Sequence, residues 1–248
     1  MKALLARVDE VLTAEPDPAR VLAILRDTLS LRHLLESITT DPQRLSTCAD
    51  ASYRHPNGFD KIVLASPSDS PLKMVLHLWN GDEEADDGHI HNHRWNFASI
   101  VLSGALQLEL YKPDSTGYGY SKMKYKPLTE VRAYQLRPSG LMKASAQAAA
   151  TLAAGSTYTW AAKLLHRAWA LPGQNTLTLI VQGPPIRKRT TVLVDSVNSV
   201  SRDVDPRLAA LRADDLGNRL AYLATSGLDA AWYSRNNAEL ISDSCSIR

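Results

Sequence analysis

Three of the seven histidines in the chain, His89, His91 and His93, occupy alternate positions within the segment GHIHNHRWNF. Alternate side chains of a β-strand point to the same face, and residues two apart lie about 7 Å apart at their Cα atoms. That spacing allows two imidazole nitrogens to converge on one metal ion at about 2 Å. The alternative is a polar strand edge with solvated histidines. However, the segment leads into the apolar run FASIVLSG, which favours a buried position where an unpaired imidazole is costly. We therefore predict a metal site.

The segments around these histidines predict mostly β-structure. Residues 1 to about 45 carry apolar residues at helical spacing, and Asp17 followed by Pro18 is typical of a helix N-terminus. From about residue 61, short apolar runs such as KIVLAS, LKMVLHLW and NTLTLIVQG alternate with turn residues, which favours an antiparallel sandwich or barrel. Helical spacing returns after Ser201.

Two spacings resemble the motifs of the cupin family. The first is His91-x-His93-x3-Phe97-x6-Gly104, and the second runs from Gly155 to His166. The resemblance covers about residues 50–195. It implies a mainly β fold, the cupin double-stranded β-helix barrel of jelly-roll type, with one metal ion near its open end. We accordingly expect an N-terminal helical extension over 1–50, the barrel over 51–200 and a C-terminal helical extension over 201–248.

Within the cupins, the chain resembles the cysteine dioxygenase branch. Phe97 stands where most cupins have a glutamate ligand, and the remaining ligand set is three histidines, His91, His93 and His166. The branch also implies that Arg54, in the dipeptide YR, holds a substrate carboxylate. A surface salt bridge is the alternative role for this arginine. In animal-type members a Ser-His-Tyr relay lies on the strand after the third ligand; here that strand carries Thr178, Ile180 and Gln182.

Four residues are candidate substrate contacts: Arg54, His89, Trp95 and Phe97. The register that places Gly104 correctly leaves His89 one step nearer the barrel mouth, outside the ligand set. Trp95 and Phe97 share the histidine face if the strand is unbroken, and are either plain core or the wall of an apolar pocket. We expect His77 to be a core histidine, and His55, before Pro56 in a turn, to be exposed.

Three neutral imidazoles leave a divalent ion its full charge and open positions, which suits Fe²⁺ binding a small acid and O2; Zn²⁺, Ni²⁺ and Cu²⁺ are alternatives. The expected function is that of a mononuclear non-haem metal-dependent oxygenase acting on a small carboxylate-bearing molecule. A non-redox metal-dependent lyase or isomerase, or a cupin that binds a ligand without turnover, is the alternative.

Composition narrows the possible partners. The 28 basic and 26 acidic residues are mixed along the chain, and the short run IRKRT is a weak signal for nucleic acid. We expect no targeting segment, because the first residues lack a continuous apolar core, and no apolar stretch reaches membrane-spanning length. Cys48 and Cys245 are far apart, which favours the reducing cytoplasm. We expect no nucleic-acid or membrane partner, and a homodimer is possible because cupins often pair through barrel edges.

Overall fold

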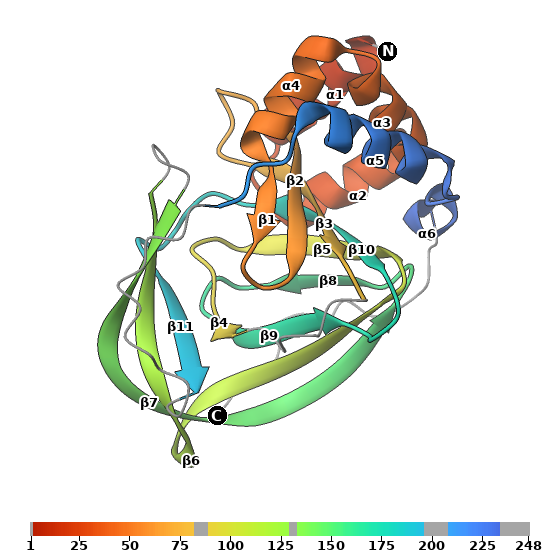
Figure 1. Ribbon diagram of the computed structural model, residues 1–248. Coiled ribbons are helices and arrows are strands. Elements are labelled where there is room, and N and C mark those ends of the chain that lie inside the picture. The colour runs from red at the N-terminus through yellow and green to blue at the C-terminus, as the bar shows by residue number, and fades with distance from the viewer. Residues whose placement is uncertain (1, 82–88, 129–132, 196–207, 234–248) are drawn as a thin grey trace.

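The computed structural model describes residues 2–81, 89–128, 133–195 and 208–233. Helices precede and follow the strands, and Figure 1 shows them gathered on one side of the β-structure. The helices are α1 (Lys2–Ala14), α2 (Pro18–Thr28), α3 (Leu31–Thr39), α4 (Pro42–Ala51), α5 (Ala213–Thr225) and α6 (Asp229–Tyr233). As predicted, Asp17 caps α2: its carboxylate accepts a hydrogen bond from the backbone N–H of Ala19, and Pro18 begins the helix.

The strands form two antiparallel sheets. The six-stranded sheet has the order β1-β2-β3-β10-β5-β8, and the five-stranded sheet the order β11-β4-β9-β6-β7. Their bounds are β1 (Tyr53–His55), β2 (Phe59–Ala65), β3 (Lys73–Trp79), β4 (Ile90–His91), β5 (Phe97–Ser103), β6 (Ala105–Leu128), β7 (Ala133–Ala153), β8 (Thr157–Trp160), β9 (Leu165–Ala170), β10 (Thr176–Gln182) and β11 (Thr190–Asp195).

The six-stranded sheet is covered on both faces. Its central strand β10 lies between β3 and β5, and all seven of its residues are buried. One face packs under the helices in a single apolar core that includes Leu76, Leu179, Leu35 and Leu220. The other face looks into the β-structure and carries aromatic residues such as Phe59 and Trp160. This division leaves the inner face available to line a site.

The helices at the two ends of the chain pack together. Trp232 of α6 is fully buried, and its indole N–H donates to the backbone carbonyl of Leu29 at 2.8 Å. Arg26 donates to the carbonyl of Trp232 at 2.7 Å. The helical segments therefore form one layer over the sheet. Within the described residues, no helix is both long and apolar enough to cross a bilayer.

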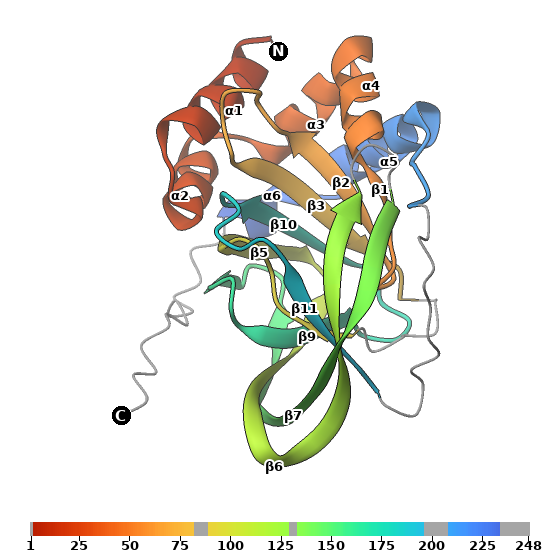
Figure 2. The same cartoon turned by 90° about the vertical axis from the view of Figure 1, so that its left-hand side faces the viewer.

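A long two-stranded arm, β6 and β7, extends far beyond the short strands that sequence patterning predicted in this region. The first part of β6 pairs with β9, and a later part, from Tyr120 to Tyr125, pairs with β11. Figure 2 shows the arm curving away from the helices and returning towards β11. Its second strand contains the alanine-rich segment Ser145–Ala153, and alanine has low strand propensity. Pairing along nearly the whole of β6, rather than local propensity, accounts for this strand.

The expected fold class is confirmed: the protein is mainly β, with two antiparallel sheets and helices at both ends. The helices α1 to α4 cover residues 2–51 and the strands cover 53–195. Of the predicted C-terminal extension, residues 201–207 and 234–248 lie outside the described residues, as does Cys245. Cys48 is buried and unpaired.

Candidate metal centre

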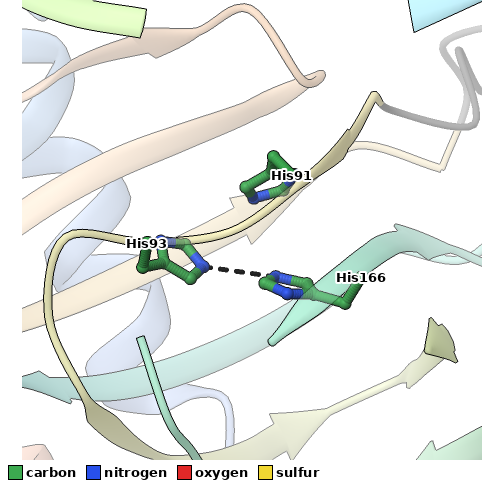
Figure 3. A group of neighbouring side chains, drawn as sticks. All are labelled: His91, His93 and His166. Carbon is green, nitrogen blue, oxygen red and sulfur yellow. Dashed lines mark hydrogen bonds between the residues drawn. The ribbon is translucent and has the colours of Figure 1, made fainter. Parts of the chain in front are cut away.

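The structure brings His91, His93 and His166 together. Each offers one ring nitrogen, and the three nitrogens lie within 4.8 Å of one another. The Nε2 atoms of His93 and His166 are 3.2 Å apart. Figure 3 shows the rings converging from two directions, His91 and His93 from the segment around β4 and His166 from β9. His91 and His166 are register partners in the antiparallel pairing of these strands, which explains how so distant a residue reaches the site.

Backbone carbonyls orient two of the rings. The Nδ1 atom of His91 lies 2.7 Å from the carbonyl oxygen of His89, and that of His166 lies 3.1 Å from the carbonyl oxygen of Leu164. A carbonyl only accepts, so Nδ1 carries the proton in both rings and the Nε2 lone pair is free to bind. This arrangement is the usual support of a metal-binding histidine.

Burial keeps the imidazoles neutral. Desolvation lowers the pKa of His91 below its usual value, although the backbone hydrogen bond opposes this. Desolvation also holds the pKa values of His93 and His166 well below the usual range, and for each of them the neighbouring imidazoles add to the effect. Neutral imidazole is the form that binds metals, so the three rings are competent ligands at pH 7.

The donor set fits a divalent ion. Two nitrogens bound to one ion at about 2.1 Å each lie roughly 3 Å apart, and the His93–His166 separation of 3.2 Å is of that size. In the absence of an ion, the Nε2 atom of His166 presents a lone pair to His93. The two neutral imidazoles can then share only one hydrogen bond, which His93 donates. The triad has no carboxylate member among the described residues, and Phe97 occupies the glutamate position of the motif.

Asn92 holds the ligand segment in place. It lies between two ligand residues, is 4% exposed, and its side-chain Oδ1 accepts from the backbone N–H of Thr191 at 2.8 Å. Its own N–H donates to the carbonyl of Thr191 at 3.1 Å. The pair of bonds anchors the chain to β11 just after the two-residue strand β4 ends. Sequence reasoning placed Asn92 on the opposite face and assigned it no role.

The three imidazoles open into a cavity of about 190 Å³. Trp95 and Phe97 both line it, and their ring centroids lie 5.6 and 5.1 Å from that of His93. The strand is not continuous, since residues 92–96 are irregular between β4 and β5, yet both side chains reach the expected side. Trp160 packs 4.2 Å from the His166 ring and completes the apolar floor. A cavity of roughly 150 Å³ holds benzene, so this one suits a compact molecule.

His89 also lines the cavity, but it does not belong to the triad. Its backbone carbonyl fixes the His91 ring, as described above. Its place outside the ligand set and its contact with substrate both stay predictions.

Arg54 does not line the cavity, contrary to the placement that the resemblance implies. Its guanidinium lies 3.3 Å from the carboxylate of Asp60, its register partner on β2. Arg219 of α5 donates to the same carboxylate. The reason is strand alternation: Tyr53 and His55 point inward, so Arg54 points towards the helices. The structure thus shows Arg54 in an ion pair with Asp60 on the helical side of the sheet.

Among the described residues, the lysine or arginine that lines the cavity is Lys61 of β2, which the sequence analysis did not single out. Strand alternation could have indicated its position, because Phe59 and Lys61 lie two residues apart on one face of β2.

Two further histidines lie in the cavity wall. His55 is not exposed as expected: its ring stacks on Phe59 at 4.4 Å, and its Nδ1 accepts from the backbone N–H of Asn57 at 3.1 Å. The ring of His77 also stacks on Phe59, with the two ring centroids 4.2 Å apart. His77 was expected in the core, and it lines the cavity from β3. Burial lowers the pKa of both rings well below the usual value.

The strand that follows the third ligand faces the cavity with Thr178, Ile180 and Gln182. The hydroxyl of Thr178 is buried and has no hydrogen-bond partner within the described structure. This strand therefore presents one hydroxyl, one aliphatic and one amide side chain to the site.

Comparison with protein-family models and with curated proteins finds no match. Solved structures with a similar fold include hydroxypropylphosphonic acid epoxidase from S. wedmorenis, at 14% identity and a TM-score of 0.33 over 53% of each chain. Another solved structure, described under the DMSP lyases RdDddP and RnDddQII, matches at 17% identity and a TM-score of 0.30, over 50% of this chain and 47% of that one. The chain thus spans about half the length of these structures. The assignment of the site rests on the geometry of this chain alone.

Proposed function

We propose that the protein is a mononuclear metal-dependent enzyme of the cupin type, an oxygenase that binds Fe²⁺ through His91, His93 and His166 and acts on a small acid with O2. The observation that carries the proposal is the convergence of three neutral imidazoles in one cavity lined by aromatic residues. An Fe²⁺ ion held there would supply redox chemistry with O2 and open positions for a substrate.

The residues of the chain orient the ligand rings and exclude water from the cavity. The carbonyls of His89 and Leu164 hold two ligand rings in one tautomer, and Asn92 fixes the segment that carries them. Phe97 and Trp160 close the inner end with apolar surface. Such a wall keeps water from the reacting molecule and strengthens every electrostatic contact inside the cavity.

A non-redox lyase or isomerase is the second candidate. The specific observation in its favour is that the strand after the third ligand carries Thr178, Ile180 and Gln182 in place of a Ser-His-Tyr relay. None of these three side chains titrates near neutral pH, so proton movement in the cavity falls to other groups of its wall, the histidines and Lys61.

The first experiment measures metal. Wild type, His166→Ala and His33→Ala are purified, loaded with Fe²⁺ or Zn²⁺ without oxygen, desalted and analysed by mass spectrometry for metal. His33 is exposed on α3 and is the matched control. We expect one ion per chain in wild type and control, and less than a tenth of that in His166→Ala. Full metal content in His166→Ala overturns the proposal.

The second experiment measures turnover. The iron-loaded protein is screened in an oxygen electrode against small acids bearing thiol, hydroxyl or amino groups, in parallel with anaerobic incubations analysed for substrate loss. Oxygen uptake that depends on substrate supports the oxygenase. Substrate loss at equal rates with and without oxygen identifies a lyase or isomerase instead. Binding without loss under either condition identifies a cupin that holds its ligand without turnover.

A further inference from the structure

Lys61 occupies an unusual position, because it is a lysine on the inner face of a barrel. It lies in the middle of β2, paired with Tyr53 on one side and His77 on the other. Both of these partners line the same cavity as Lys61. The ammonium therefore faces the space that also receives the three imidazoles, and it does so from a rigid strand.

No negative charge offsets this ammonium within the described structure. Among the described residues, those that line the cavity include neither aspartate nor glutamate. The described ion pairs do not involve Lys61, and the nearby Asp60 points to the helical side, where it binds Arg54 and Arg219. Arg94, whose guanidinium carbon lies 5.3 Å from the Trp95 ring, adds a second positive charge close by.

Aromatic rings hold the ammonium in place. Its Nζ atom lies 5.8 Å from the ring centroid of Tyr53 and 5.5 Å from that of Trp95. The Trp95 ring in turn lies 5.6 Å from the His93 ring, so the ammonium and the metal-ligand cluster share an aromatic neighbour. Such cation–π contacts stabilise a cation without neutralising it.

The surrounding groups leave the ammonium available to an anion. Burial and the charge of Arg94 lower the pKa of Lys61 to about 8, so most of it remains charged at pH 7. Burial raises the pKa of Tyr53 to about 12, which keeps its phenol a neutral hydrogen-bond donor. Tyr125 and Tyr134 of the β6–β7 arm also line this part of the cavity, with stacked rings 5.2 Å apart.

We infer that Lys61 is the residue that binds the substrate's anionic group, and that the cavity selects compact monoanions with an apolar or aromatic body. The anion sits against the Lys61 ammonium, and the body lies along Trp95 and Phe97 towards the three imidazoles. This inference rests on the proposed function in taking the cavity as the substrate site, but it concerns ligand charge rather than the metal.

The test uses benzoate and its neutral isostere benzamide as probes. Binding is measured by calorimetry on metal-free protein and again after one equivalent of Zn²⁺, at pH 7, for wild type, Lys61→Met, Lys61→Arg and Lys143→Met. Lys143 is an exposed lysine of β7 and is the matched control. Circular dichroism and zinc content are recorded for every variant, so loss of fold or of the metal site is seen separately.

We expect wild type to bind benzoate at least tenfold more tightly than benzamide, because a charge-assisted contact in a partly enclosed cavity is worth about a factor of ten. Lys61→Met should lose that preference while still binding zinc; Lys61→Arg should retain most of it, and Lys143→Met all of it. The measurement on metal-free protein does not depend on the metal site, so it remains decisive even if the His166→Ala experiment overturns the proposed site. The inference is overturned if folded wild type shows no preference for benzoate, or if folded Lys61→Met keeps it. If Lys61→Met does not fold, Lys61→Gln takes its place. An unchanged preference for benzoate in that variant contradicts the inference, and a lost preference supports it.

Discussion

The Nε2 atoms of His93 and His166 lie 3.2 Å apart, although 73 residues separate the two in the sequence. One belongs to the segment that follows β4, and the other to β9, and the pairing of these strands sets the distance. A site built across a β-ladder is rigid, so its ligands keep nearly the geometry that an ion requires before any ion binds. Changes to the groups that hold this segment should therefore alter metal affinity without unfolding the barrel.

His89→Ala should leave metal content at the wild-type level. The His89 contact with the ligand ring is made by its backbone carbonyl, which alanine retains, and its side chain is not a member of the triad. Benzoate affinity should change instead, because the imidazole lines the cavity. Metal analysis beside His91→Ala provides the measurement. Equal metal loss in the two variants would place His89 in the ligand set.

Asn92→Ala should weaken zinc binding by about 10- to 100-fold, the usual effect of removing a group that orients metal ligands. The side-chain acceptor for Thr191 is lost, and the chain between His91 and His93 gains freedom. Competition with a chelating dye measures the affinity. Asn218→Ala, on the exposed face of α5, is the control and should match wild type. An unaltered zinc affinity in Asn92→Ala would show that β4 pairing alone holds the ligands.

Stability of the metal-free protein should fall as the pH drops below about 6.5. The buried ring of His77 has a pKa well below its usual value, so the unfolded chain takes up a proton at a pH where the folded protein does not. Stability from this group is complete above the unfolded pKa of about 6.5 and is lost as pH falls towards the folded pKa, at up to about 1.4 kcal/mol per pH unit.

His77→Phe removes the titrating group and keeps the stacked ring on Phe59. Urea unfolding at pH 7 and pH 5.5, with chelator present, should therefore show a smaller pH dependence for this variant than for wild type. The exposed residue His33 supplies the control His33→Phe. A pH dependence in His77→Phe as steep as in wild type would assign the acid sensitivity to other groups.

Gly104→Ala should destabilise the barrel by more than about 1 kcal/mol. Gly104 has φ of +72°, and an added Cβ would lie 2.5 Å from the carbonyl oxygen of Asn175. Thermal unfolding measures the effect. Gly119→Ala, in the strand β6 that follows Gly104, has open space around it and should be close to neutral. Equal melting temperatures for the two variants would mean that the turn can relax.

The local patterns in the sequence determined a good part of this protein. Alternation of His91 and His93, the apolar run after them and the two motif spacings predicted strands, a barrel and the three imidazoles that the structure brings together. The fold class follows from periodicity because a two-residue repeat has only one way to bury its apolar side. The N-terminal helices follow from spacing and from caps such as Asp17.

Only the tertiary structure decided what surrounds the imidazoles. Arg54 and Lys61 are both basic residues on neighbouring strands, and the sequence analysis singled out the one that does not line the cavity, because the face of a three-residue strand is set by its partner and not by its own pattern. The turn histidine His55 became a cavity residue for the same reason. The β6–β7 arm owes its length to pairing that continues through the alanine-rich segment of β7, and the arm carries Tyr125 and Tyr134 to the site. The set of side chains that meet in a cavity depends on the register between distant strands, and local sequence patterns do not predict that register.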